Sequence, residues 1–459
     1  MKAKATNEAS GDSEPSQIQP RSRAWMWVLL ITVAAFCVRA GMIQALGDAT
    51  NFHVAEKNPR ALIWEWGYEQ GAISQSLANG DGFRDPFLKE SGPTAWAAPL
   101  YPMLVATLLT ITDGPHWSTA VALALIQALS AALTCVFLFR LGRALHSEAL
   151  GLLAAAAWAL HPMGAYLPVA LVWDSTFVAL GITWFLANLA EAGRHPSTRT
   201  AAWLGVRFGA VLLVNPAPMA LVPMIVCYLA LQKPLGASIQ RAVRPLAAFA
   251  LAAAVVTAPW TIRNALVLGS PNIRTNLGVE LFVGNNDGAT GPFNGQVHPA
   301  YNADEFARYV ELGEVAYSAD CRDRAIAWAR ANPDRFASLT AERFQRFWIG
   351  PDPRAKVYLG MGTEHKRDWQ GWIKYVSHAL AGLLGVLGCL LWRSPVSGSA
   401  WIPRGTLLLF PAVYYLTHVF ERYRFPIEPI VTLAAAALLL RLLPVRLKQA
   451  VTVALSSKP

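Results

Sequence analysis

The chain has 459 residues, of which 54% are hydrophobic and only 15% charged, and its mean hydropathy is +0.33. Soluble chains carry about 25% charged residues, so this composition excludes a soluble multidomain protein, and it also excludes a disordered or collagen-like chain. The formal net charge of +10 would suggest nucleic acid binding only if the basic residues shared one soluble face, whereas in membrane proteins they collect in cytoplasmic loops. We therefore expect an integral membrane protein that does not bind nucleic acid.

The N-terminal region is polar and then becomes apolar. Residues 1–23 carry basic residues but lack the apolar core of a signal peptide, and we expect a disordered cytoplasmic terminus. Residues 24–46 are apolar and long enough to cross a bilayer. We interpret them as a signal anchor with its N-terminus inside, so that residues 47–98 form the first outer loop.

Further apolar segments follow along the chain. They cover residues 97–112, 118–139, 148–167, 172–191, 201–214, 216–231, 245–262, 371–391, 405–420 and 429–443. Basic residues that belong on the cytoplasmic side flank many of them, including Arg140, Arg143, Arg194, Arg199, Lys233, Arg241, Arg244, Arg393, Arg404, Arg446 and Lys448. Only one crossing fits between the first outer loop and Arg140, so the proline-containing segment 97–112 is expected to be a juxtamembrane or re-entrant helix. The sequence therefore predicts an all-α polytopic membrane protein with about ten transmembrane helices and both termini inside.

A second long outer segment covers residues 264–370, and its pattern predicts an extracytoplasmic helical cap. Residues 303–331 are partly periodic, and Asn332-Pro333-Asp334 is typical of a helix start, with a helix that continues to Trp348. The remaining parts are then a transmembrane module at 24–263, C-terminal transmembrane helices at 371–447 and a cytoplasmic tail at 448–459.

The five cysteines indicate neither a disulfide framework nor a metal cluster, because four of them lie in apolar stretches and only Cys321 lies in a polar segment. No metal ligand is assigned. Two carboxylates without a clear third ligand leave the use of a divalent cation undecided, and no other cofactor is indicated.

Five ionisable residues lie where outer segments meet the membrane: Glu69, Asp174, Arg263, Arg422 and Arg424. Placing an ionisable side chain at a membrane boundary costs free energy, so these residues are candidates for function. Arginine binds phosphate through its planar fork, and a nearby carboxylate can take a proton from a hydroxyl group. A carboxylate base beside a phosphate-binding arginine is therefore the arrangement expected for transfer of a group from a lipid-linked phosphate.

Structural roles remain open for each of these residues. Glu69 could be a solvated loop residue, and Asp174 could cap the helix that follows it. The three arginines could be interfacial anchors whose side chains reach the lipid head groups. No single residue decides between these alternatives.

Several longer motifs resemble a known family. They include YEQGAISQSLANGDGF followed by SGPTAWAAPLYP, HPMGAYLPVALVWDSTF, TAPWTIRNALVLGSPNIRTNLGVELFVGNNDGATG, the Asn-Pro-Asp helix ending in RFQRFW, and THVFERYRFPIEP. Together they resemble the bacterial polytopic glycosyltransferases of the family 39 type, in the GT-C superfamily, whose members include protein mannosyltransferases and lipid A aminoarabinose transferases. The resemblance covers most of the chain from about Trp25 to Pro444.

The resemblance implies a GT-C bundle that uses a polyprenyl-phosphate sugar as donor. The family's first-loop acid falls on Glu69, the predicted catalytic base, with Glu65 as the reserve candidate. Asp174 matches a second acid, and Arg263, Arg422 and Arg424 match basic residues expected to bind the donor phosphate. The chain departs from many relatives at Asn215-Pro216, where they carry Arg-Pro, and its first-loop acid is a lone glutamate.

The expected function is therefore transfer of the sugar, with inversion, to a hydroxyl group of a lipid, glycan or protein acceptor. The expected location is the extracytoplasmic face of the bacterial inner membrane. A transporter or flippase of lipid-linked glycans is an alternative, although the sequence contains no inverted repeat of the kind many transporters have. A non-catalytic scaffold that binds partners through residues 264–370 is another.

Overall fold

The computed structural model describes residues 23–45, 67–87, 89–193, 197–231, 239–350, 368–396 and 398–444. Residues 1–22 of the predicted N-terminus, Glu65 and the tail at 448–459 lie outside these ranges. Within them the chain is helical, with one isolated antiparallel bridge between Arg84 and Pro93. The chain is an all-α polytopic membrane protein.

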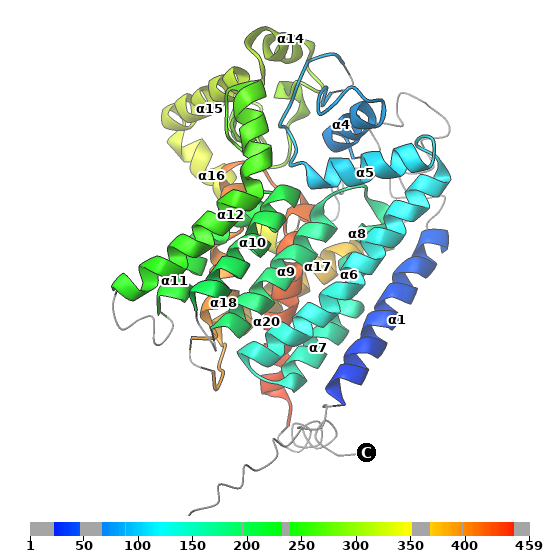
Figure 1. Cartoon of the computed structure of the whole chain (residues 1–459), viewed down its shortest axis with the longest axis vertical. Coiled ribbons are helices and arrows are strands. Elements are labelled where there is room, and N and C mark those ends of the chain that lie inside the picture. The colour runs from blue at the N-terminus through cyan, green and yellow to red at the C-terminus, as the bar shows by residue number, and fades with distance from the viewer. Residues whose placement is uncertain are drawn as a thin grey trace, which may run out of the picture.

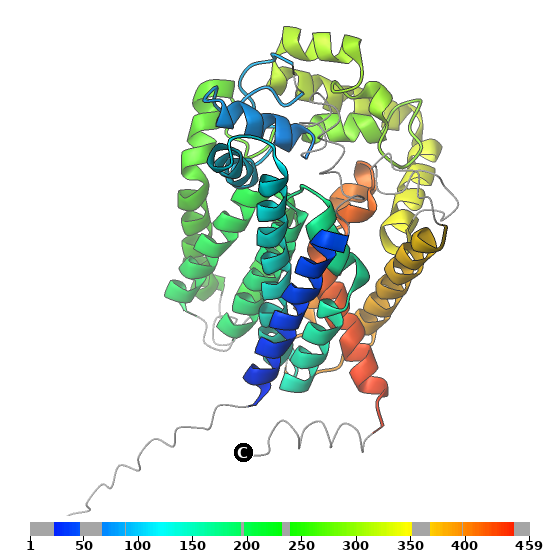
Figure 2. The same ribbon diagram turned by 90° about the vertical axis from the view of Figure 1, so that its right-hand side faces the viewer.

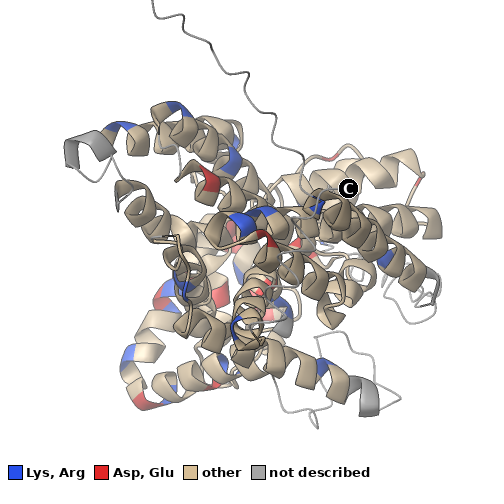
Figure 3. Ribbon diagram, turned by 90° about the horizontal axis from the view of Figure 1, so that it is seen from below, with Lys and Arg blue, Asp and Glu red and all other residues tan. Residues whose placement is uncertain are grey.

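Six of the described helical segments are long and apolar enough to cross a membrane, and they run side by side as a bundle (Figures 1 and 2). They are Ala24–Ile43 in α1 (Ala24–Ala45), α6 (Trp117–Leu145), α9 (Ser175–Ala192), Val243–Leu268 in α12 (Ile239–Leu268), Trp372–Leu390 in α17 (Asp368–Leu390), and Phe425–Leu442, made of η5 (Phe425–Ile427) and α20 (Glu428–Leu442). The pair α7 (Glu148–Ala159) and α8 (Pro162–Ala170) gives a seventh if the 50° bend between them lies within one span. Most of the ribbon is uncharged when the bundle is seen from below (Figure 3).

This number is lower than the ten or so spans predicted from the sequence. Three of the predicted segments form short or broken helices in the described part of the chain. They are α10 (Thr198–Val214), the pair η1 (Ala217–Leu221) and α11 (Val222–Leu231), and the pair α18 (Trp401–Leu409) and α19 (Ala412–Leu416). Pro216 and Pro411 stand at the N-cap positions of η1 and α19. Proline cannot donate the backbone hydrogen bond that would continue the preceding helix, so that helix ends before each proline.

The segment 97–112 forms α5 (Leu100–Ile111), which has 12 residues and is too short for a crossing of about 30 Å. It lies across the upper end of the bundle in Figure 1, beside α4 (Glu69–Ala78). Its position agrees with the expected juxtamembrane helix.

The bend between α7 and α8 is stabilised by a buried arginine. Pro162 begins α8 and interrupts the backbone hydrogen bonds, so carbonyl groups at the end of α7 need other donors. Arg39, in α1, donates from Nη2 to the Trp158 carbonyl at 3.3 Å, from Nη1 to the Ala159 carbonyl at 3.3 Å and from Nε to the Gly164 carbonyl at 2.9 Å. This charge within the bundle therefore has a structural role.

The outer segment packs above one end of the bundle. It contains α13 (Leu277–Gly284), η3 (Gly295–Val297), α14 (Ala303–Leu312), α15 (Glu314–Ala331) and α16 (Pro333–Ile349). The predicted helix after Asn332 is confirmed as α16, although Asn332 does not cap it and its side-chain amide instead donates to the Trp328 carbonyl at 3.0 Å. The short helix η4 (Glu421–Tyr423) also lies at this end (Figure 1).

One apolar cluster joins the cap to the first outer loop. It includes Ile73 of α4, Trp96 of the loop, Trp260 of α12, and Val279 and Tyr317 of the cap. Each of these side chains is at least 93% buried, and burying a large apolar side chain contributes about 1.5–3 kcal/mol. The cap and loop therefore form one packed unit over the bundle.

Candidate functional site

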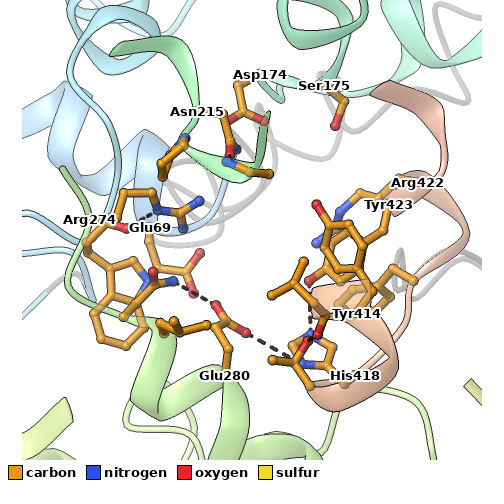
Figure 4. Close-up of a pocket in the computed structure, with 18 of the residues that line it drawn as sticks. Glu69, Asp174, Ser175, Asn215, Arg274, Glu280, Tyr414, His418, Arg422 and Tyr423 are labelled. Atoms are coloured by element: carbon orange, nitrogen blue, oxygen red, sulfur yellow. Dashed lines mark hydrogen bonds and ion pairs between the residues drawn. The ribbon is translucent and has the colours of Figure 1, made fainter. Parts of the chain in front are cut away.

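A cavity of about 560 Å³ lies where the first outer loop, the cap and the bundle meet (Figure 4). Its lining includes Glu69, Asp174, Arg274, Glu280 and Arg422, which come from four separate parts of the chain. Three carboxylates and two guanidiniums therefore share one enclosed space beside apolar and aromatic side chains.

Glu69 is the first residue of α4, and the chain reaches it through a tight turn. Gly67 has a φ of 102°, and a Cβ atom there would lie 2.8 Å from the Val172 carbonyl oxygen. The next residue, Tyr68, also has a positive φ of 52°. This turn holds the start of α4 against the segment that precedes α9, and so holds Glu69 near Asp174.

The Glu69 carboxylate is partly withdrawn from solvent. Its Oε1 lies 3.7 Å from Nε2 of His298, and its side chain is 16% exposed. Burial raises the pKa of the Glu69 carboxyl, while the positive charges of Arg422 and Arg274 oppose the shift. Desolvation makes a carboxylate a stronger base, and the neighbouring arginines favour its ionised form.

His298 faces Glu69 as a neutral imidazole. Its Nδ1 accepts a hydrogen bond from the Ala300 backbone N–H at 3.1 Å, so the ring proton is assigned to Nε2, on the side of Glu69. Burial lowers the pKa of His298 to about 3. The ring therefore directs its N–H towards Glu69, at a distance too long for a hydrogen bond, and adds no positive charge at neutral pH.

Asp174 connects three helices at the cavity. Its Oδ2 accepts from Nε2 of Gln70 in α4 at 3.2 Å and from Nδ2 of Asn215 at the end of α10 at 2.8 Å. Asp174 occupies the N-cap position of α9, but its side chain makes no capping hydrogen bond. The capping alternative is therefore not the role of this carboxylate. Asn215 and Gln70 serve as its hydrogen-bond donors.

Arg422 is the predicted arginine that reaches the cavity. Its guanidinium carbon lies 4.3 Å from the ring centroids of both Trp173 and Phe420. The residue is 8% exposed, and its Nε has no hydrogen-bond partner among the described residues. A buried donor without a partner is costly, so the Nε–H of Arg422 favours an acceptor that the described residues do not supply.

Arg263 and Arg424 do not line this cavity. Arg263 donates from Nη1 to the Thr94 carbonyl at 2.6 Å and from Nη2 to the Phe83 carbonyl at 3.0 Å, and so ties the first outer loop to α12. Arg424 is 1% exposed and pairs with Glu428 at 2.6 Å inside the bundle. Both guanidiniums are used structurally, and we withdraw them from the predicted phosphate-binding residues.

Two charged residues of the cavity, Arg274 and Glu280, were not predicted from the sequence as site residues. Arg274 donates from Nε to the Trp96 carbonyl at 2.8 Å and lies beside Glu69 in Figure 4. Glu280, in α13, accepts from Nδ2 of Asn276 at 2.7 Å, and its Oε2 lies 3.5 Å from Nδ1 of His418. Both belong to the motif NIRTNLGVELFVGNN, which is part of the family resemblance, but charged residues are ordinary in a polar outer segment.

The described residues do not form a conventional metal site. Among them, no group of three or more His, Cys, Asp and Glu side chains is arranged to hold a metal ion. The carboxylates are instead partnered by amides, by neutral histidines and by the charges of two arginines.

Comparisons with known proteins place the fold. No family model matches the sequence, and no curated protein matches it. The apo oligosaccharyltransferase of Archaeoglobus fulgidus aligns with a TM-score of 0.50 and 14% identity, over 95% of this chain and 53% of that chain. The fold is of the GT-C type. A structure of the archaeal oligosaccharyltransferase AglB from the same organism, with an inhibitory peptide and a dolichol-phosphate, aligns with a TM-score of 0.49 and 14% identity, over 95% and 53% of the two chains. This chain thus spans about half the length of these proteins, and the likeness does not distinguish the family 39 type.

Proposed function

We propose that this protein is a membrane glycosyltransferase of the family 39 type that transfers a sugar from a polyprenyl-phosphate donor to an acceptor hydroxyl group. One observation carries the proposal. The desolvated carboxylate of Glu69 and the guanidinium of Arg422, whose Nε has no hydrogen-bond partner among the described residues, line the same cavity at one end of a GT-C bundle. A base and an anion-binding group are the two elements that this reaction needs.

The donor phosphate binds to Arg422 and Arg274, with its prenyl tail directed towards the lipid. Negative charge develops on the phosphate oxygen as the bond to the anomeric carbon breaks, and the two guanidiniums stabilise that charge. The Nε–H of Arg422 has no hydrogen-bond partner among the described residues, and a phosphate oxygen would supply one. Its aromatic neighbours exclude water and so strengthen the interaction.

Glu69 takes the proton from the acceptor hydroxyl as its oxygen attacks the anomeric carbon from the face opposite the phosphate. A single displacement of this kind inverts the anomeric configuration. Asp174 acts as a positioning residue, because it accepts a hydrogen bond from Gln70, the residue that follows Glu69 in α4. The acceptor is a hydroxyl group of a lipid, glycan or protein.

The bacterial inner membrane, with the cavity on its extracytoplasmic side, is the proposed location. Two arrangements support this orientation. Helix α4, whose first residue Glu69 lines the cavity, lies at the opposite end of the bundle from the start of α1 and the end of α20 (Figure 1). Arg140 and Arg143 lie in the last part of α6, towards that far end, where the positive-inside rule puts the cytoplasm.

The alternative functions gain less support. A transporter should carry charges in its bundle that are available to its substrate, but Arg39 and Arg424 are occupied by carbonyl groups and Glu428. A scaffold would not need Glu69 and Arg422 in one cavity. We therefore retain catalysis as the proposed function.

The test uses the full chain in phospholipid nanodiscs with radiolabelled polyprenyl-phosphate mannose, glucose or aminoarabinose. An enzyme should release unlabelled polyprenyl phosphate and give a covalently labelled acceptor from membrane extracts. Reconstitution in sealed liposomes tests the flippase alternative. Movement of intact donor across the bilayer, with no cleavage of any of the donors, would support a flippase and overturn the proposed transfer.

A further inference from the structure

A second carboxyl group lines the cavity, and the mechanism above gives it no role. Glu280 projects from α13 in the cap, whereas Glu69 lies in the first outer loop. Figure 4 shows Glu280 between Glu69 on one side and His418 on the other, with Arg422 above His418. Glu280 therefore lines the same cavity as the proposed base and the two arginines proposed to bind phosphate.

The contacts of Glu280 suit a carboxyl group that both holds and releases a proton. Its Oε1 accepts from Nδ2 of Asn276 at 2.7 Å, and its Oε2 lies 3.5 Å from Nδ1 of His418. Nε2 of His418 is 2.9 Å from the Tyr423 hydroxyl. If the tyrosine donates to Nε2, the histidine proton lies on Nδ1 and faces the carboxylate that remains after proton release.

Charged and titratable groups surround Glu280 on every side of the cavity. Burial raises the pKa of Glu280 to about 7, and the negative charge of Glu69 adds to the shift, while Arg274 and Arg422 oppose it. Burial also lowers the pKa of His418 to about 3, with Arg422 adding to the shift, so this neighbour stays neutral. The other titratable groups among the described residues that line the cavity are Asp174, His298 and the hydroxyl groups of Tyr68, Tyr301, Tyr414 and Tyr423.

We propose that Glu280 is the general acid that protonates the leaving prenyl phosphate. This role rests on the glycosyl transfer proposed above. A prenyl phosphate released from a phosphodiester is a monoester with a second pKa of about 6, so a neighbouring acid of similar strength is well matched to it. Two carboxyl groups with different protonation states, one acid and one base, also catalyse inverting displacements in glycosidases.

The proton balance of the cycle closes within the cavity. The acceptor oxygen forms its bond to the anomeric carbon, and its proton passes to Glu69. The bond between the anomeric carbon and the phosphate oxygen breaks, its electron pair stays on that oxygen, and the proton of Glu280 passes to the phosphate. Protonated Glu69 then returns a proton to ionised Glu280. The net products are the glycoside and the protonated prenyl phosphate, and no other reactant is needed.

The proposal is tested by the pH dependence of turnover for the wild type, Glu280→Gln and Glu280→Asp, with a labelled polyprenyl-phosphate hexose that the wild type accepts. Wild-type turnover should fall as the pH rises above about 7, because Glu280 then loses its proton. Glu280→Gln keeps the oxygen that accepts from Asn276 and should fold, but its turnover should fall at least about 100-fold and lose the decline at high pH. Glu280→Asp should restore part of the turnover together with that decline.

Three outcomes contradict the proposal in distinguishable ways. Near-normal turnover of Glu280→Gln while Glu69→Gln is inactive would remove the acid role and leave the glycosyltransferase function standing. A slow Glu280→Gln that keeps the decline at high pH would assign that decline to another group and also overturn the acid role. Absence of transfer by the wild type from every donor would overturn the proposed function, and the acid role with it. Glu311→Gln, an exposed glutamate of α14, is the matched control and should behave as the wild type.

Discussion

Arg422 allows the phosphate-binding proposal to be tested against a closely matched neighbour. Its guanidinium stacks on Trp173 and Phe420, its Nε has no partner among the described residues, and it lines the cavity. Arg424, two residues later, points into the bundle and has four hydrogen bonds to Glu428 and to backbone carbonyls. The same substitution should therefore have opposite consequences at the two positions.

Arg422→Gln should weaken binding of polyprenyl phosphate. A hydrogen bond to a charged group contributes about 1.5–3 kcal/mol, which corresponds to a rise in Kd of about 10- to 100-fold. Loss of the stacking on two aromatic rings should cost about 1 kcal/mol of folding stability, and so leave the protein folded. Arg422→Lys keeps the charge but loses the planar fork, and its Kd should be intermediate.

Equilibrium binding of radiolabelled polyprenyl phosphate to the purified protein in detergent measures this effect, with the apparent Tm recorded for each variant. Arg424→Gln leaves a buried carboxylate unpaired and should lose about 3–5 kcal/mol of stability. Arg308→Gln, at an exposed ion pair of the cap, should change neither quantity. A Kd for Arg422→Gln equal to that of the wild type would refute the role of Arg422 in phosphate binding.

Three further predictions concern the residues around the cavity. Asp174→Ala removes the acceptor of two side-chain amides, so the start of α4 should shift. Turnover should then fall about 10- to 100-fold with little change in donor Kd. A loss of donor affinity as large as the loss of turnover would contradict a positioning role. Glu314→Ala leaves the Tyr309 hydroxyl, the Ala95 N–H and two threonine hydroxyls without their acceptor. Thermal unfolding should show a loss of about 3 kcal/mol in the free energy of unfolding. An unchanged apparent Tm would show that water replaces the carboxylate. The pKa of His298 is lowered to about 3, so below pH of about 6.5 the unfolded chain binds a proton that the folded protein does not. Stability should therefore be highest above that pH and should fall as the pH decreases towards 3; a profile as steep for His298→Gln as for the wild type would assign the loss to other groups.

The sequence identified part of the site because polar residues stand out beside apolar spans. Glu69, Asp174 and Arg422 were found in this way, and all three line the cavity. The same reasoning included Arg263 and Arg424, because distance along the sequence does not tell which way a side chain points. Arg424 lies four residues before Glu428, which places the two side chains on one face of the chain as it enters α20, and this spacing is the pattern that could have indicated a structural ion pair.

The site residues that were not predicted from the sequence lie in a polar segment of the chain. Arg274 and Glu280 belong to the outer segment, where charged residues are common and burial cannot be recognised from composition. Their role depends on the cap folding over the bundle, with Glu314 holding Thr275 and the backbone of Ala95 together. Such contacts join residues far apart in the chain and leave no local pattern in the sequence.

The number of spans was overestimated for a related reason. Hydropathy recognises an apolar segment but does not tell whether it forms one straight helix. Prolines such as Pro216 and Pro411 divide some of these segments into helices shorter than a bilayer. The class of fold was nevertheless predicted correctly, because the apolar segments form helices whether or not each one is long enough to cross a membrane.

The catalytic role of Glu69 is the central claim, and one paired measurement tests it most directly. Donor Kd and single-turnover rate are measured for the wild type and Glu69→Gln in the same nanodiscs, with a polyprenyl-phosphate hexose that the wild type uses. Glutamine keeps the size of the side chain and removes the base, so the Kd should be unchanged while the transfer rate falls at least about 100-fold. A transfer rate equal to that of the wild type would show that Glu69 is not the base.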